Sequence, residues 1–132
     1  MVALEIHGGV TVTVKRYKSL IKMIELKTMG INYDPVNIIY YQGLRSERDI
    51  IDIQPKYLKY FHLKDKIGGK VEYNFPDIGE GNINFIKIME VLRIKNYEGP
   101  FSLELEFVDK NPESPKVIDK VLKRYYICRI LA

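Results

Sequence analysis

Glu5, Asp34, His62 and Glu104 carry side chains that can ligate a metal ion, and each lies near the end of a different strand-like segment. Three carboxylates and an imidazole suit a hard or borderline divalent cation. The imidazole argues against a site built only for Ca²⁺, and the lack of a thiolate argues against structural zinc. The four residues therefore predict a metal site, provided that the fold gathers the four segment ends.

The spacing of apolar residues predicts elements that alternate between strand and helix. We expect strands over 2–8, 31–34, 57–64 and 101–107, and helices over about 13–29, 46–54, 84–95 and 114–131. Gly30 is expected to end the first helix, and 37–45 and 65–81 are expected to be loops. This alternation predicts an α/β fold with a parallel sheet made of right-handed βαβ units.

The polar residues of the predicted strands share one face. Strands of a parallel sheet are normally covered on both faces and read as continuous apolar runs. Here one face carries ionisable groups while the other carries residues such as Ile6, Phe61 and Leu103. The polar set is Glu5, His7, His62, Lys64, Ser102, Glu104 and Glu106. We interpret this face as the inside of a barrel with a site at the carboxyl ends of its strands. The alternative is an open sheet with charged edges.

Composition limits the classes of protein that fit. The chain has 132 residues, of which 46% are hydrophobic and 29% charged, as expected for a single globular domain over 1–132. No apolar run reaches the length of a membrane span and the first residues show no signal-peptide pattern, so we expect a cytoplasmic protein. Cys128 is expected to be a buried helical residue. The net charge of +4 is spread among acids, which makes a nucleic-acid partner the less favoured reading.

Several stretches, taken together, resemble the xylose isomerase-like TIM barrel family of sugar-phosphate isomerases, epimerases and dehydratases. The stretches are ALEIHGG, NYDPVN and HLKDK…DIGEGNINFIKIMEVLRIKNYEGPFSLELE. Asn96 stands where the family usually has glycine. The resemblance covers essentially the whole chain but maps onto strands five to eight, the C-terminal half of a (β/α)₈ barrel. It thus implies a (β/α)₄ half of a TIM barrel.

The resemblance also implies roles for individual residues. Glu5, Asp34, His62 and Glu104 match the family's ligands for Mn²⁺, Mg²⁺, Co²⁺ or Zn²⁺, and His7, Asn37 and Lys64 match positions that face substrate. Glu5 and Glu104 would move a proton through an enediolate during isomerisation or epimerisation of a sugar or sugar phosphate. The related apurinic endonucleases need further histidines. Asn37 and the histidine-free stretch 67–79 disfavour that activity.

Two alternatives remain for a half barrel. It can be active as part of a homo-oligomer in which two copies complete a barrel, or as the C-terminal fragment of an enzyme whose missing N-terminal half completes it. It can also be a non-catalytic remnant that oligomerises to hide its sheet edges. Asp65 and Glu80 are expected to orient loops, and Tyr40 and Tyr41 either to flank a sugar or to anchor a loop.

Overall fold

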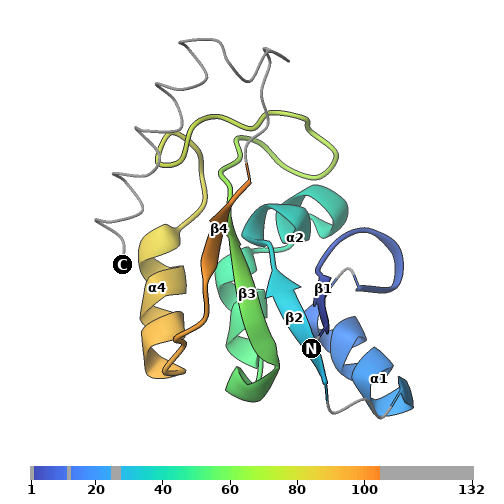
Figure 1. Cartoon of the computed structure of the whole chain (residues 1–132). Helices are drawn as coiled ribbons and strands as arrows, with labels where there is room; N and C mark the ends of the chain where they lie inside the picture. Colours follow the sequence, from blue (N-terminus) through green and yellow to red (C-terminus); the bar gives the residue numbers. More distant parts are fainter. Residues whose placement is uncertain (1, 12, 25–27, 105–132) are drawn as a thin grey trace, which may run out of the picture.

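A four-stranded parallel sheet forms the centre of the protein (Figure 1). The computed structural model describes residues 2–11, 13–24 and 28–104. The strands are β1 (Val2–Glu5), β2 (Met29–Tyr33), β3 (Leu58–Leu63) and β4 (Phe101–Leu103), and they are adjacent in the order in which the chain makes them. Every neighbouring pair is parallel, so all four carboxyl ends meet at one edge of the sheet. The predicted parallel α/β arrangement is confirmed.

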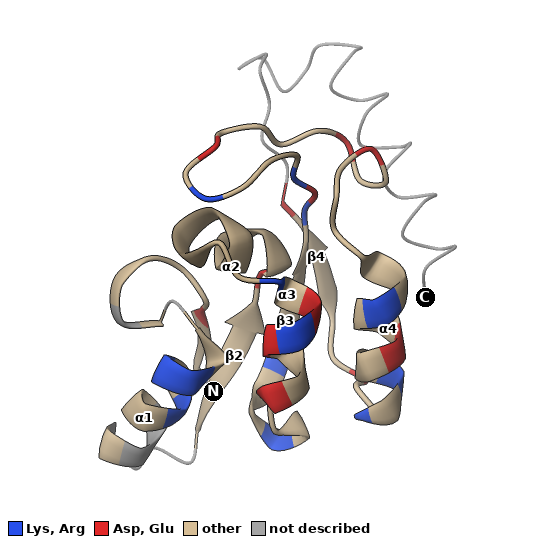
Figure 2. Cartoon of the chain, turned by 180° about the vertical axis from the view of Figure 1, so that it is seen from behind, with Lys and Arg blue, Asp and Glu red and all other residues tan. Residues whose placement is uncertain are grey.

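The helices connect successive strands and cover one face of the sheet. Seen from behind, α1, α3 and α4 lie in front of the strands (Figure 2). Lys and Arg lie on all three of these helices, and α3 and α4 also carry acids. The helices and turns of 3₁₀ type are η1 (Gly9–Thr11), α1 (Val14–Ile24), α2 (Pro35–Gln42), α3 (Ser46–Asp49), η2 (Ile50–Asp52), η3 (Pro55–Tyr57) and α4 (Phe85–Ile94).

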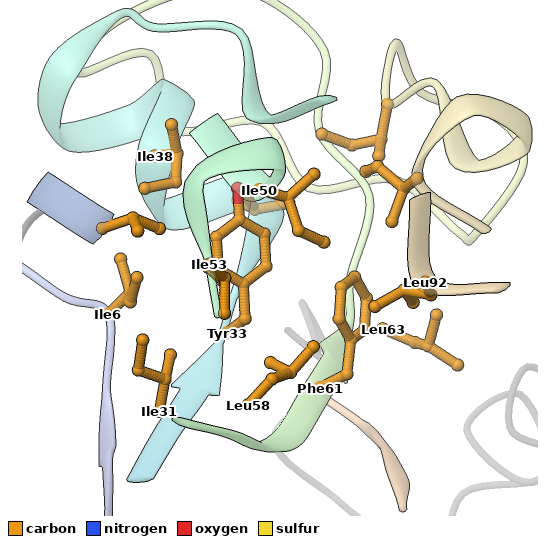
Figure 3. Packing of buried hydrophobic residues seen from close by; sticks show 14 of the residues in the cluster. Ile6, Ile31, Tyr33, Ile38, Ile50, Ile53, Leu58, Phe61, Leu63 and Leu92 are labelled. Atoms are coloured by element: carbon orange, nitrogen blue, oxygen red, sulfur yellow. The ribbon is translucent and has the colours of Figure 1, made fainter. Parts of the chain in front are cut away.

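The core lies between the helix-covered face of the sheet and the helices (Figure 3). Alternation along β2 and β3 sends Ile31, Tyr33, Phe61 and Leu63 into this layer, where each is at most 3% exposed. Burying one such side chain contributes roughly 1.5–3 kcal/mol. This face was predicted to be the helix-facing one. The opposite face is therefore the one that carries the polar side chains of the strands.

The predicted helix over 84–95 matches α4 closely. Asn84 is its N-cap, and the Asn84 side chain accepts a hydrogen bond of 3.1 Å from the Lys87 backbone N–H. An N-cap of this kind satisfies one of the backbone donors left open at a helix start. The predicted strand over 57–64 is likewise close to β3.

The predicted loop over 37–45 is wrong in its first part, because α2 occupies Pro35–Gln42. The side chain of Asp34 accepts hydrogen bonds from the backbone N–H groups of Val36 and Asn37, and Pro35 provides the fixed φ that suits the first turn. Gly43, with φ of 67°, ends the helix in the left-handed conformation. Pro35 thus starts a helix as well as ending a strand.

Other boundaries also differ from the expectation. Gly30 does not end a helix. It lies buried within β2, where Lys59 Cγ would be 2.0 Å from an added Cβ, so the strand needs glycine there. The predicted helix over 46–54 divides into the short α3 and η2. β1 ends at Glu5, so His7 lies beyond the strand on which it was expected.

Several expectations lie outside the described residues. These are the end of the fourth strand with Glu106, the closing helix over 114–131 and Cys128. Within the described ranges, no helix has the length and apolar character needed to cross a membrane.

Candidate metal centre

The four predicted ligands come together at the carboxyl edge of the sheet. Glu5 ends β1, Asp34 follows β2, His62 lies near the end of β3 and Glu104 follows β4. The Glu104 backbone N–H donates to the Leu63 carbonyl, which extends the pairing of β3 with β4 to this residue. Each residue offers one ligand atom, and these four atoms lie within 4.8 Å of one another.

The imidazole of His62 is the centre of the cluster. Its Nδ1 lies 2.8 Å from Glu104 Oε2, 3.5 Å from Glu5 Oε1 and 3.8 Å from Asp34 Oδ2. Two ligand atoms that are each about 2.1 Å from a tetrahedral ion are roughly 3.4 Å apart. The distances from Nδ1 to Glu5 and Asp34 are close to this separation, and the shorter one to Glu104 is that of an ion pair.

Asp34 uses its two oxygens differently. Oδ1 accepts hydrogen bonds of 2.7 Å from the Val36 N–H and 3.1 Å from the Asn37 N–H at the start of α2. The positive end of a helix stabilises a negative charge at this position. Oδ2 is left facing His62. The start of α2 therefore holds a fully buried carboxylate with one oxygen directed to the centre.

Asn37 positions Glu5 rather than standing alone in the site. Its Nδ2 donates to Glu5 Oε1 and to the Ile6 carbonyl oxygen, both at 3.0 Å. These bonds use both protons of the amide nitrogen, and the residue is only 6% exposed. A contact between Asn37 and a substrate stays a prediction.

Lys64 holds the fourth carboxylate. Its Nζ donates to Glu104 Oε1 at 2.9 Å and lies 4.6 Å from the centre of the Phe75 ring. His62 and Lys64 lower the pKa of Glu104 to about 2, so this carboxylate is ionised over the whole physiological range. A substrate contact of Lys64 remains a prediction.

The electrostatics of the cluster favour a bound cation. The neighbouring Asp34 and Glu104 raise the pKa of His62 to about 10, while burial raises the pKa of Glu5. With a neutral imidazole, Lys64 offsets one of the three carboxylate charges, and a divalent ion offsets the other two. Among the described residues, the buried atoms Asp34 Oδ2, His62 Nδ1 and Glu104 Oε2 have no hydrogen-bond partner beyond their contacts with one another. Buried polar atoms normally have one, so these atoms and their chemistry fit a metal ion.

A structured loop follows β3 and lies above the carboxyl ends of the strands (Figure 1). Asp65, which is 1% exposed, organises it by accepting backbone hydrogen bonds. The donors are the N–H groups of Lys66, Gly79, Gly81 and Ile83. The expected role of Asp65 in orienting this loop is confirmed.

Lys66 ties the same loop to α2. It is fully buried, its Nζ donates to the carbonyls of Ile67 and Glu72, and it lies 5.7 Å from the Tyr40 ring and 5.5 Å from the Phe75 ring. The Tyr40 carbonyl also accepts a hydrogen bond from the loop. Of its two expected roles, Tyr40 has that of a loop anchor.

His7 lies beside the centre and pairs with Tyr41. The rings are 4.7 Å apart, and Tyr41 Oη lies 3.0 Å from His7 Nε2. His7 is exposed, so the expected contact with substrate stays a prediction. Sequence reasoning did not single out Phe75 or Asn32. Phase along β2 could have found Asn32, because it lies two residues before Asp34 and shares its face.

Comparison with known proteins identifies the fold. The model of a family described as xylose isomerase-like TIM barrel matches residues 1–125. The chain belongs to this family. The expectation that it corresponds to strands five to eight of such a barrel stays a prediction.

The proteins to which this xylose isomerase-like chain is similar are longer than it is. It is 26% identical over 120 residues to uncharacterized protein MJ1311 of Methanocaldococcus jannaschii. The aligned residues cover 90% of this chain and 39% of that protein. A xylose isomerase domain protein from Planctomyces limnophilus superposes with a TM-score of 0.79 at 20% identity, covering 98% of this chain and 45% of that one. The chain therefore spans less than half the length of these relatives.

Two further structures share the fold. A D-tagatose 3-epimerase-like protein has a TM-score of 0.69 at 23% identity and is covered over 47% of its length, with 98% of this chain aligned. The IolI protein with a bound zinc atom has a TM-score of 0.70 at 16% identity, with 95% of this chain and 47% of that chain aligned. At these identities the likeness concerns the fold.

Proposed function

We propose that this chain supplies the metal-binding part of a divalent-metal-dependent isomerase or epimerase that acts on a sugar or sugar phosphate. The observation that carries the proposal is the convergence of three carboxylates on Nδ1 of His62. The family, and the epimerase-like and zinc-containing structures that share the fold, support it. The cytoplasmic location expected from the sequence belongs to this proposal.

Glu5, Asp34, His62 and Glu104 are the residues that would hold the ion. A bound divalent cation would polarise the carbonyl of a hydroxy-ketone and so acidify the neighbouring C–H bond. The side chains around it keep their orientation through donors of this chain. Asn37 holds Glu5, the start of α2 holds Asp34, and Lys64 holds Glu104.

Glu5 and Glu104 are the proposed proton carriers. Removing a proton from one carbon of the hydroxy-ketone gives an enediolate, and returning it to the neighbouring carbon or to the opposite face gives the isomer or epimer. Burial raises the pKa of Glu5, which makes it the better proton acceptor, whereas His62 and Lys64 keep Glu104 a weak base. We therefore assign the first proton abstraction to Glu5.

The remainder of the barrel wall is part of the proposal. A closed barrel of this family has eight strands, and the described part of this chain provides four, with β1 and β4 at the edges. We expect the polar face to be completed by a second copy of the chain, or by four further βα units. In either arrangement the four metal ligands come from this chain.

The Glu104→Gln variant tests the proposal. Its neutral amide offers a weaker ligand, so binding of Mn²⁺ measured by calorimetry should weaken by tenfold or more, and epimerisation of a panel of ketoses and their phosphates should stop. Glu90→Gln, on the exposed side of α4, is the matched control and should change neither. Unchanged Mn²⁺ affinity in Glu104→Gln would reject the site.

A further inference from the structure

We infer that Asn32 is the positioning residue that fixes which nitrogen of His62 faces the metal, an inference that rests on the proposed metal site. Nδ2 of Asn32 lies 2.7 Å from Nε2 of His62, on the side of the ring opposite the carboxylates. The two ends of the imidazole therefore have different partners. Nδ1 faces Glu5, Asp34 and Glu104, and Nε2 faces one carboxamide.

The backbone places Asn32 beneath the centre. It is directly opposite Glu5 in the pairing of β1 with β2, and the Ile6 N–H donates to its carbonyl at 2.9 Å. On the other side, the pairing of β2 with β3 is irregular between Ile31 and Asn32, where β3 carries one extra residue. A bulge of this kind re-aims neighbouring side chains. Asn32 consequently reaches the ring of His62 from the polar face.

The chemistry of the ring decides how the carboxamide must face it. Nδ1 can bind a cation only through its lone pair, so a neutral, metal-binding imidazole carries its proton on Nε2. That proton requires an acceptor, and Asn32 Oδ1 is the acceptor within reach. Oδ1 is buried and has no hydrogen-bond partner among the described residues. Half a turn about the Cβ–Cγ bond exchanges the amide's nitrogen and oxygen with little change of shape and brings Oδ1 onto Nε2.

With Nδ2 towards the ring, Oδ1 is unpaired, so the proton on the ring decides between the two orientations. With Nδ2 facing it, Nε2 must act as an acceptor and the proton must sit on Nδ1, where it blocks the metal position. With Oδ1 facing it, Nε2 keeps its proton, and Nδ1 is free to bind the ion once the protonated ring has lost its second proton. The side chain of Asn32 is therefore a two-position element, and the orientation that accepts from Nε2 is the one that prepares His62 for the ion. Groups that orient a ligating histidine typically change metal affinity by 10- to 100-fold when removed.

Nitrogen NMR of the 132-residue chain, labelled at histidine and loaded with Zn²⁺, tests this assignment. The chain has two histidines, so the exposed His7 is replaced in a His7→Gln background to leave the signals of His62 alone. We expect Nδ1 to carry the metal and Nε2 to carry a proton that exchanges slowly with water. Zn²⁺ bound through Nε2 would overturn the inference. This measurement is made with Asn32 unsubstituted.

Two variants then separate positioning from packing. Asn32→Leu, of similar size, should bind Zn²⁺ 10- to 100-fold more weakly, and its Nε2 proton should exchange rapidly. Asn32→Asp keeps an oxygen acceptor and should restore both the affinity and the slow exchange. If the added charge of Asn32→Asp acted alone, it would raise the affinity for Zn²⁺ without slowing the exchange of the His62 Nε2 proton. If Asn32 had a purely structural role, Asn32→Asp would bind Zn²⁺ more weakly than Asn32→Leu. The reason is that a carboxylate added opposite Glu5 disfavours folding more than leucine does.

The outcomes distinguish this inference from the proposed function. Failure of the unaltered chain to bind Zn²⁺ would remove the metal site and the role of Asn32 together. Binding through Nδ1 that is unchanged in Asn32→Leu, with the same slow proton exchange, would leave the metal site standing and reject only the role of Asn32.

Discussion

Raising the pH from 7.0 to 8.5 should tighten binding of Co²⁺ to the metal centre about 30-fold. In the metal-free chain the pKa of His62 is about 10, because Asp34 and Glu104 stabilise the protonated ring. A metal-binding imidazole must lose this proton, so below pH 10 each bound ion releases one proton. The association constant then rises tenfold per pH unit, or about 1.4 kcal/mol.

Glu104 does not alter this slope, because its pKa is about 2 and it is already ionised throughout the range. Burial raises the pKa of Glu5, so a proton held by Glu5 would steepen the dependence further. The His62→Gln variant therefore isolates the contribution of His62.

Calorimetric titration with Co²⁺ in buffers of different ionisation enthalpy measures both the affinity and the number of protons released. We expect close to one proton per ion at pH 7.5. The His62→Gln variant should bind weakly and lose the slope, because its amide has no proton to release. An affinity that does not change between pH 7.0 and 8.5, with no proton released, would refute the reasoning, since His62 would then be neutral before the ion binds.

Three further predictions concern stability. The metal-free chain should lose stability to urea as the pH rises from about 6.5 towards 10, by up to about 1.4 kcal/mol per pH unit. The cause is that folding raises the pKa of His62, so the folded chain keeps a proton that the unfolded chain has lost. An equally steep loss in His62→Gln would contradict this. Asp65→Ala should lower the unfolding free energy by roughly 2–4 kcal/mol, because it leaves buried N–H groups unpaired, while the exposed Asp52→Ala changes it little. Gly30→Ala should cost about 1–3 kcal/mol through its clash with Lys59, and Lys59→Ala should recover part of that loss; strictly additive effects would exclude the clash.

The order of the strands and the polarity of their faces were predictable because both depend on short-range patterns. A period of two placed Phe61 and Leu63 in the core and His62 on the other face, and a parallel sheet brought the strand ends together. Helix starts that depend on one side chain were harder to predict. Asp34 caps α2 and is also a candidate ligand, and reading Pro35 only as the end of a strand hid the helix that follows.

The candidate ligands could be named from the sequence, but the groups that hold them could not all be. Asn37 was expected to face a substrate, yet the first turn of α2 brings its amide nitrogen to Glu5. Asn32 reaches His62 through an irregular pairing of β2 with β3. Phe75 meets Lys64 because a long loop folds back over the strand ends. Such contacts depend on loop paths and strand register, which local patterns do not specify.

Anomalous diffraction from crystals of the chain grown with Mn²⁺ is the most direct test of the account. We predict one strong peak, which marks a Mn²⁺ ion bound by Glu5, Asp34, His62 Nδ1 and Glu104. Density for Mn²⁺ elsewhere, with these four side chains still paired with one another as in the metal-free chain, would contradict the proposed metal centre.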